Sequence, residues 1–458
     1  MLQSAPPDKK NWQNMYIFLP FLLHYCITAC KASTGRRLPG RSALSQGLNH
    51  KETISAALSH VYQESLPQLS TRQDIYRLEA LSQDYNHEII LVIRQRNMLE
   101  LKRILNDVSD PMSLNYAQYL TGKEVADLTS NPEARNAVVT YLQANGVSTI
   151  SETMYGDYIT ANAPVSVWEK VLSTVFYTFN HTQLNGVVEQ LVRAESYSIP
   201  IELTNHVDCV LNTIEMPVRT TLGHPIPVMT SLSSKRMAGT AAQTPTASIK
   251  PIDIMKYYNM SNVFGSSEST QAAYSGYKNH FSPMALAYFQ KNISIQALQP
   301  ALSVGGYVTD DSALNSAEGN LDIQYLMGLS QGSPTTFWHS NGGLSQWLIE
   351  VANTPNPPLV LSISYGADES STSKSEHHVF TTQAMKLSVR GVTILTASGD
   401  DGVHSPLARL NALSCGYQPG FPATNPYVTA IGATSVSTYT AEYSDFPLNS
   451  RLISHSFT

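Results

Sequence analysis

The chain carries little charge of either sign. Charged residues make up 14% of its 458 residues, against roughly a quarter in an average soluble domain, and the formal net charge is -6. A nucleic-acid-binding domain needs a positively charged face, which a net negative, weakly charged chain does not supply. The composition therefore excludes nucleic acid as a partner and leaves a globular chain long enough to hold two or three domains.

Cysteine is also scarce. Of four cysteines, Cys26 and Cys30 fall in an apolar block near the N-terminus, and only Cys209 and Cys415 remain for a mature chain. These two lie far apart and lack the spacing of metal ligands. They either pair with each other or remain as two buried thiols, and the fold does not depend on a disulfide framework.

Long hydrophobic runs are missing too. The apolar block Met15 to Ala29 is flanked by Lys9, Lys10 and Lys31. It is shorter than the roughly 20 apolar residues that a membrane-spanning helix needs, so it favours a secretory signal peptide over a membrane anchor. We assign residues 1–32 to the signal region, with Met15 as an alternative start because basic residues normally stand at the beginning of a signal.

Three glycosylation triplets fit the same secretory route: Asn180-His-Thr, Asn259-Met-Ser and Asn292-Ile-Ser. Together with the signal region they predict a secreted glycoprotein with no membrane attachment once the signal is removed. A lysosome-like or vacuole-like compartment is the alternative destination.

Residues 51–217 have the pattern of a compact α+β domain. Helices are predicted at Gln73–Leu81 and Glu133–Asn145, and the second has a proline at its start and a glycine after its end. Strands are predicted at Glu88–Arg94 and Asp157–Thr160. Residues 218–250 follow as a linker, because Val228 to Lys250 is rich in Ser, Thr and Ala, and such stretches stay exposed where proteases cut.

Residues 251–458 alternate between helix and strand patterns. Strands are predicted at 358–364 and 391–397, and helices at 281–290 and 381–390. Short, continuously apolar strands joined by helices predict a doubly wound parallel sheet, an α/β fold. Ligands bind such sheets at the carboxyl ends of the strands, which here lead into the loops at 364–369 and 398–402.

Two carboxylates, Glu318 and Asp322, stand four residues apart at the start of a helix-like run. On a helix they share one face, and two acids that are close and desolvated do not both ionise readily. One then keeps a proton while the other acts as a base. The alternative is an exposed first turn whose acids merely complement the helix dipole.

Five sequence words surround this pair: Asp110-Pro-Met-Ser-Leu-Asn-Tyr-Ala-Gln-Tyr-Leu-Thr121, Glu318-x-x-Leu-Asp322-x-Gln-Tyr-Leu-Met, Ser362-x-Ser-Tyr-Gly-x-Asp-Glu369, Ala397-Ser-Gly-Asp-Asp-Gly402 and Phe421-Pro-Ala-x-x-Pro-Tyr-Val-Thr429. With these words in register, the sequence resembles the sedolisins, serine-carboxyl peptidases that include tripeptidyl-peptidases and kumamolisin. The resemblance extends from about Leu99 to about Thr434. It implies a subtilisin-like doubly wound sheet, incomplete in this sequence, behind a pro-kumamolisin-like α+β propeptide.

The resemblance also implies roles for residues. Glu318 would take a proton from a serine, Asp322 would hold Glu318 and share its proton, and Asp400 would line the oxyanion hole. Such carboxyl chemistry suits acidic pH, because a carboxyl donates a hydrogen bond only while protonated. Tyr365, Gly366 and Asp368 are expected to shape the site. The propeptide would act as intramolecular inhibitor and chaperone, and the substrates would be peptides or proteins.

The nucleophile of the family lies in a Ser-Gly-Thr-Ser segment, which this sequence does not contain up to Thr458, and the family's Ca²⁺ ligands also lie beyond that residue. Ser435 sits where the family has a structural strand. Ser330 lies in a G-x-S-x-G word, but a nucleophile elbow needs a strand before it and a helix after it. We expect neither serine to be the nucleophile. His377 and His378 are expected in a solvated loop and not at a metal.

Two functions follow. The first is a secreted acid serine-carboxyl peptidase zymogen that cleaves peptides by acyl transfer, with removal of N-terminal tripeptides as one form of this activity. In that case residues 1–458 alone are inactive for lack of the serine. The second is an inactive relative that binds peptides or a protease.

Overall fold

The computed structural model describes residues 60–66, 74–182, 188–217, 250–260, 264–276, 279–292, 301–305, 317–340, 342–399, 403, 416–435 and 451–453. All of them belong to one compact unit, Ser55–Thr458. The predicted signal region, most of the predicted linker, Asp400 and Cys415 lie outside the described residues.

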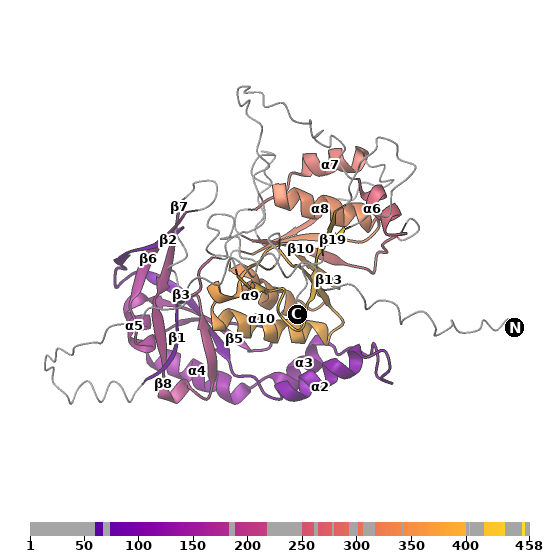
Figure 1. Cartoon of the computed structure of the whole chain (residues 1–458). Coiled ribbons are helices and arrows are strands. Elements are labelled where there is room, and N and C mark those ends of the chain that lie inside the picture. Colours follow the sequence, from indigo (N-terminus) through magenta and orange to yellow (C-terminus); the bar gives the residue numbers. More distant parts are fainter. Residues whose placement is uncertain are drawn as a thin grey trace, which may run out of the picture. The chain divides into compact units, whose positions relative to one another are not determined.

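The first part of the described chain is an α+β domain built on antiparallel sheets (Figure 1). A four-stranded sheet has the order β4-β5-β3-β9, a three-stranded sheet the order β2-β6-β7, and β1 pairs with β8. The elements are β1 (His60–Ser65), β2 (Ile75–Ala80), β3 (Asn86–Ile93), α2 (Met98–Ser109), α3 (Gly122–Thr129), α4 (Pro132–Ala144), β4 (Thr149–Glu152), β5 (Tyr158–Pro164), α5 (Val165–Leu172), β6 (Phe176–Thr182), β7 (Val188–Ala194), β8 (Ser196–Pro200), the 3₁₀ turn Ile201–Leu203 and β9 (Val207–Leu211).

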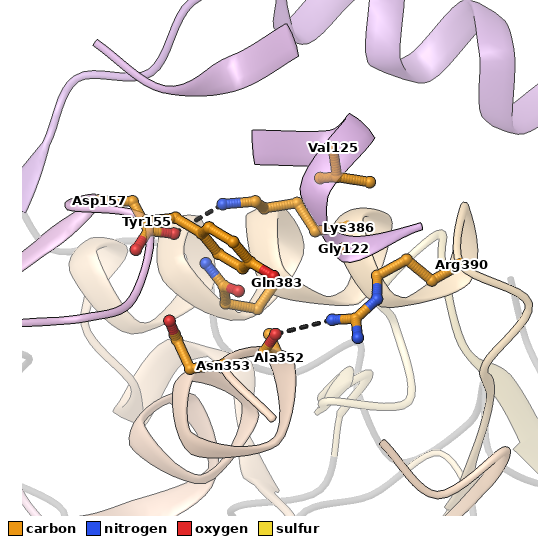
Figure 2. Close-up of a pocket in the computed structure, with 9 residues that line it drawn as sticks. All are labelled: Gly122, Val125, Tyr155, Asp157, Ala352, Asn353, Gln383, Lys386 and Arg390. Carbon is orange, nitrogen blue, oxygen red and sulfur yellow. Dashed lines mark hydrogen bonds and ion pairs between the residues drawn. The ribbon is translucent and has the colours of Figure 1, made fainter. Parts of the chain in front are cut away.

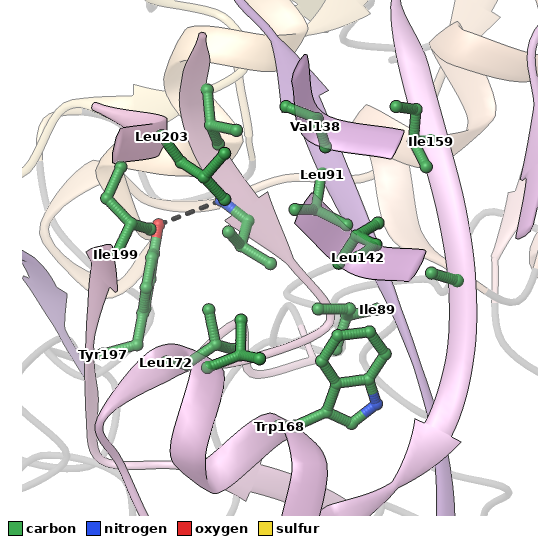
Figure 3. Packing of buried hydrophobic residues seen from close by; sticks show 14 of the residues in the cluster. Ile89, Leu91, Val138, Leu142, Ile159, Trp168, Leu172, Tyr197, Ile199 and Leu203 are labelled. Atoms are coloured by element: carbon green, nitrogen blue, oxygen red, sulfur yellow. Dashed lines mark hydrogen bonds between the residues drawn. The ribbon is translucent and has the colours of Figure 1, made fainter. Parts of the chain in front are cut away.

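Strand β3 explains the apolar run Ile89–Ile93 within the predicted strand. Side chains alternate across a strand, and Ile89, Leu91 and Ile93 pack with α4 and α5 in the core of this domain (Figure 3). Ile90 and Val92 point to the other face, where they meet residues of the second half of the chain. Both faces of β3 are therefore buried, as its sequence indicates.

The helix predicted at Gln73–Leu81 is wrong, because this segment forms β2, which pairs antiparallel with β6. The spacing of Ile75 and Leu78 imitates a helical period, but Ile75 is buried among strand residues of the neighbouring β6 and β7. Strand pairing has overridden the local pattern. The helix predicted at Glu133–Asn145 is confirmed as α4, with Asn131 accepting a hydrogen bond from the amide of Ala134 as its cap.

The second part contains a six-stranded parallel sheet of order β11-β12-β10-β13-β15-β17. This is the predicted α/β sheet. The elements are α6 (Pro251–Tyr257), β10 (Gln271–Gly276), α7 (Pro283–Asn292), β11 (Leu302–Val304), α8 (Ala317–Leu329), β12 (Thr335–Ser340), α9 (Gly343–Ala352), β13 (Val360–Ile363), β14 (Ala367–Asp368), the 3₁₀ turn Glu369–Ser371, α10 (Lys374–Ser388), β15 (Thr393–Ala397), β16 (Gly420–Phe421), β17 (Thr429–Ile431), β18 (Ala433–Ser435) and β19 (Arg451–Ile453).

Helices cover both faces of the parallel sheet. On one face, α9 and α10 bury residues such as Trp347 and Phe380 against β10, β12, β13 and β15. On the other face, α7 and α8 pack on Phe337 of β12 through residues that include Ile323. A sheet wound in this way presents the carboxyl ends of its strands as the place for chemistry.

Helix α10 is longer than predicted. It begins at Lys374, where Ser373 and Glu376 form a capping box, and this Ser-x-x-Glu spacing is a helix start signal in the sequence. The solvated loop expected for His377 and His378 is therefore wrong. Both lie on α10, where His377 packs 4.4 Å from the ring of Phe421 and His378 faces Asp208 at 3.4 Å.

The face of α10 that points away from the parallel sheet contacts the first domain. Ser375 donates its hydroxyl to Glu64 of β1 at 2.5 Å, and Gln383 donates to the phenol oxygen of Tyr158 at 2.5 Å. Lys386 and Asp157 form an ion pair of 2.6 Å in which both side chains are about 95% buried or more. Figure 2 shows this pair beside a small cavity that Arg390 also lines.

Candidate functional site

Helix α8 carries the acid pair to the carboxyl ends of the parallel strands. Glu318 and Asp322 lie in its first two turns and are both half-buried. The hydroxyl of Ser364 donates a hydrogen bond of 2.6 Å to Oδ1 of Asp322. Because Ser364 directly follows Ile363, the last residue of β13, this contact places Asp322 at the strand ends, where the sequence predicts the site.

The start of α8 is tied to the segment that follows β10. The amide of Ser282 donates to the side-chain oxygen of Asn320 at 2.8 Å. Gly319 lies so close to this segment that an added Cβ would overlap the carbonyl oxygen of His280. Only glycine allows this approach, which fixes the turn that bears Glu318.

The environment of Asp322 keeps it protonated over a wide range of pH. Its pKa is raised from 3.8 to about 7, chiefly by burial and secondly by the charge of Glu318, while the hydrogen bond from Ser364 opposes both effects. The electrostatic coupling means that the two acids are neighbours, as the spacing predicts. The alternative of an exposed first turn is wrong for Asp322, because its carboxyl group is desolvated.

Tyr365 completes the surroundings of the pair. Its ring is buried and packs edge-on against Tyr274 at 5.4 Å, and its hydroxyl accepts a hydrogen bond from the amide of Asn279. Burial raises the pKa of Tyr365, and the negative charges of Asp322 and Glu318 raise it further. The phenol therefore stands beside both acids as a neutral group, in keeping with the shaping role expected for it.

Asp400 lies outside the described residues. The two residues before it, Ser398 and Gly399, follow β15, which pairs with β13 in parallel, so the loop that contains Asp400 starts at the same edge as Ser364. The amide of Ser398 donates to the carbonyl of Ile431 at 3.0 Å. The structure thus brings Glu318 and Asp322 together and leaves the role of Asp400 a prediction.

Of the two rejected serines, Ser330 lies far from the acid pair, and Ser435 lies at the end of a strand. Ser330 follows α8 at its far end, twelve residues or about 18 Å along the helix from Glu318, and its hydroxyl donates to the carbonyl of Leu326. It is preceded by a helix and followed by strand β12, the reverse of a nucleophile elbow. Ser435 ends strand β18, where the resemblance places a strand.

Ser364 is the site residue that the sequence analysis did not single out. It belongs to the Ser-x-Ser-Tyr-Gly word and is the first residue after a buried parallel strand, which is where ligand-facing residues occur. The position was a usable signal. Its contact with Asp322, 42 residues earlier in the chain, required the structure.

The three glycosylation triplets lie in different surroundings. Asn180 is half-buried within β6, the central strand of its sheet, and donates to the hydroxyl of Tyr76 at 3.1 Å. Asn259 and Asn292 are exposed, the first after α6 and the second at the end of α7. Glycosylation of all three stays a prediction.

Two features are absent from the described part of the chain. No described helix is long and apolar enough to cross a membrane. Within the same residues, no three His, Cys, Asp or Glu side chains gather closely enough to hold a metal ion.

Comparison with known proteins places these observations in a family context. Residues 73–216 match the Pro-kumamolisin activation domain. Tripeptidyl-peptidase 1 of Pongo abelii is 31% identical over 366 residues, which cover 76% of this chain, and tripeptidyl-peptidase 1 of Dictyostelium discoideum is 27% identical over 421 residues, 84% of this chain. The chain spans 61% of the length of the first relative and 68% of the second.

Among solved structures, Pseudomonas sedolisin, a serine-carboxyl proteinase complexed with two molecules of pseudo-iodotyrostatin, is similar to part of the chain. The two are 19% identical, and the match covers 42% of this chain and 55% of the other, with a TM-score of 0.34.

Proposed function

We propose that the chain is the zymogen of an acid serine-carboxyl peptidase of the sedolisin family, because it is similar to tripeptidyl-peptidase 1 and its residues 73–216 match the Pro-kumamolisin activation domain. The observation that carries the proposal is the desolvated, coupled pair of Glu318 and Asp322 at the carboxyl ends of a parallel sheet. Such a pair supplies both a proton acceptor and a proton donor in one place. The reaction is hydrolysis of a peptide bond by acyl transfer.

In the proposed mechanism the two acids divide their roles. Asp322 holds a proton up to about pH 7, so at acidic pH it can donate a hydrogen bond to Glu318. That hydrogen bond stabilises the ionised form of Glu318, which then takes the proton of the nucleophilic serine. Asp400 donates to the developing oxyanion while it is protonated. A histidine in place of Glu318 would be cationic at such pH and could not act as the base.

The remaining parts of the proposal concern the route of the protein. Residues 1–32 direct it into the secretory pathway, residues 51–217 inhibit and chaperone the peptidase domain 251–458, and cleavage in 218–250 separates the two. Its destination is the cell exterior, with a lysosome-like or vacuole-like compartment as the alternative. Calcium, which the family resemblance implies through ligands beyond Thr458, enters none of the steps assigned to the residues above.

The alternative function is a relative without activity that binds peptides or a protease. The position of Ser330 favours it, because its hydroxyl donates to the carbonyl of Leu326 at the end of α8 that is far from Glu318. The parallel sheet and activation domain would then serve binding alone. Proteolytic specificity, including removal of N-terminal tripeptides, belongs only to the first proposal.

The reading frame downstream of the codon for Thr458 distinguishes the two. A Ser-Gly-Thr-Ser segment encoded within some hundred codons supports the peptidase. Expression of that longer chain and a pH 4 assay on peptide substrates then tests it, with Glu318→Gln as the inactive control. A stop codon without such a segment supports the binding protein.

A further inference from the structure

Ser364 joins the acid pair to the loop that follows β13. Its hydroxyl donates a hydrogen bond of 2.6 Å to Oδ1 of Asp322. The next residue, Tyr365, is buried beside both acids, and Gly366 packs close to the backbone of Phe421. The segment is thus held by the two residues that directly follow the contact.

We propose that Ser364 is a positioning residue of the acid pair, whose hydroxyl reserves Oδ1 of Asp322 as an acceptor and so directs the shared proton to Oδ2. This inference rests on the proposed function, because Ser364 would orient Asp322, the proton donor of the proposed mechanism. Ser364 acts through Asp322 and does not itself take part in bond formation.

The chemistry of a carboxyl group supports this assignment. An oxygen that accepts a short hydrogen bond is favoured as the unprotonated oxygen, so the proton resides on the other one. With Oδ1 occupied by Ser364, the Oδ2 hydroxyl is left for Glu318, the acid whose charge acts on Asp322. Without Ser364 the proton could reside on either oxygen, and the geometry of donation to Glu318 would be lost for part of the time.

The position of Ser364 also links the pair to substrate binding. The backbone after β13 lies at the carboxyl end of the sheet, where a bound chain would run, and Ser364 is part of that backbone. A displacement of this segment by a ligand would therefore move the donor of Asp322. The protonation of the acid pair would thus depend on the position of the loop that carries Ser364.

The test is a carboxyl titration of the full 458-residue chain, which needs no activity. The ¹³C shift of the Asp322 carboxyl is followed by NMR from pH 3 to pH 9 in the wild type, Ser364→Ala, Ser364→Thr and Ser362→Ala. Loss of the donor destabilises the ionised form, so Ser364→Ala should raise the pKa of Asp322 by about one pH unit, a tenfold change in its ionisation constant. Ser364→Thr, which keeps the hydroxyl, should restore the wild-type titration, and Ser362→Ala, two residues earlier in β13, should leave it unchanged.

Near-UV circular dichroism verifies that Ser364→Ala folds. If Asp322 titrates far above pH 4 in the wild type and its titration midpoint is unchanged in Ser364→Ala, the positioning role is overturned. A wild-type Asp322 that titrates near 4 overturns the proposed acid pair itself, so the two failures are distinct. If Ser364→Ala does not fold, Ser364→Cys, which offers a weaker donor of similar size, should give an intermediate midpoint. Labelling of Ser364 by a fluorophosphonate would also contradict the proposal, since it would make Ser364 a nucleophile.

Discussion

The raised pKa of Asp322 has a measurable consequence for stability. The folded chain keeps this proton up to about pH 7, whereas an unfolded aspartate loses it near 3.8. Stability from this group is therefore complete below about pH 4 and is lost as the pH rises through 7. The sign is opposite to that of an ordinary salt-bridged aspartate.

Asp322→Asn should remove this pH dependence, because the amide cannot ionise yet still accepts the hydrogen bond of Ser364. Relative to the wild type, the variant should gain about 4 kcal/mol of unfolding free energy between pH 4 and pH 8, since each unit of pKa shift corresponds to about 1.4 kcal/mol. Urea unfolding at several pH values measures the difference. Asp127→Asn, on the exposed face of α3, is the control and should show no such trend. Parallel curves for Asp322→Asn and the wild type would contradict a desolvated carboxyl.

The sequence identifies the two acids but not the donor to Asp322. Spacing on a helix is a local property, so Glu318 and Asp322 can be paired from the sequence alone. The hydrogen bond from Ser364 joins two elements that are distant in the chain, and no local pattern encodes which of the polar residues after β13 makes it. Asp400 follows the neighbouring strand, and its place beside the pair stays a prediction.

The first turn of α8 depends on a close backbone approach at Gly319. In Gly319→Ala the new Cβ would overlap the carbonyl oxygen of His280. Relieving this overlap requires a displacement of the backbone, which costs free energy. We expect a loss of about 2 kcal/mol of stability and a lower pKa of Asp322, since a displaced helix lets water reach its carboxyl. Chemical denaturation and the NMR titration measure both effects. Gly416→Ala, whose Cβ would meet no atom within 4 Å, should change neither. If Gly319→Ala and Gly416→Ala have the same stability and the same pKa of Asp322, the close backbone approach at Gly319 does not position the acid pair.

Elements with a continuous apolar run or clearly marked ends are easier to predict than elements whose polar and apolar residues are mixed. The apolar strands β13 and β15 and the capped helix α4 follow from local pattern. Strand β2 was mistaken for a helix because its pairing with β6 is non-local. Helix α10 was predicted too short because its first turns, which include Ser375, Glu376 and His378, look like a solvated segment.

The coupling free energy between Lys386 and Asp157 measures how strongly this ion pair joins α10 to the first domain. Lys386→Met leaves a buried carboxylate without its cation, which typically costs about 3 kcal/mol or more. In Lys386→Met/Asp157→Asn most of this loss should be recovered, so the two single effects should be far from additive. The exposed pair Lys123 and Asp127 provides the matched cycle and should couple by less than about 1 kcal/mol. Additive losses at Lys386 and Asp157 would argue against a tight interface.

Helix α10 packs against both halves of the chain. Its two faces differ in composition, which bears on whether the halves can separate. One face, with Phe380 and Leu387, belongs permanently to the core on the parallel sheet. The opposite face is buried too, yet it carries Ser375, Gln383 and Lys386, which water can solvate. Val379 and Met385 of α10 also pack against apolar residues of the first domain, so the interface is mixed, as interfaces between separable domains often are. Separation of the first domain would therefore expose a mixed surface and not a wholly apolar one.

Residues 1–458 by themselves should not hydrolyse peptides at pH 4, even after cleavage of the linker has released the peptidase part. The acid pair can accept a proton, but acyl transfer also needs a nucleophile beside it, and Ser330 donates its hydroxyl to its own helix instead. Release of product from a fluorogenic tripeptide substrate measures turnover, with a tripeptidyl-peptidase in the same buffer as the positive control. Turnover that disappears in Ser330→Ala or Ser435→Ala would show that a rejected serine is the nucleophile. Turnover that disappears only in Ser364→Ala would instead transfer the role of nucleophile to the hydroxyl that already contacts Asp322.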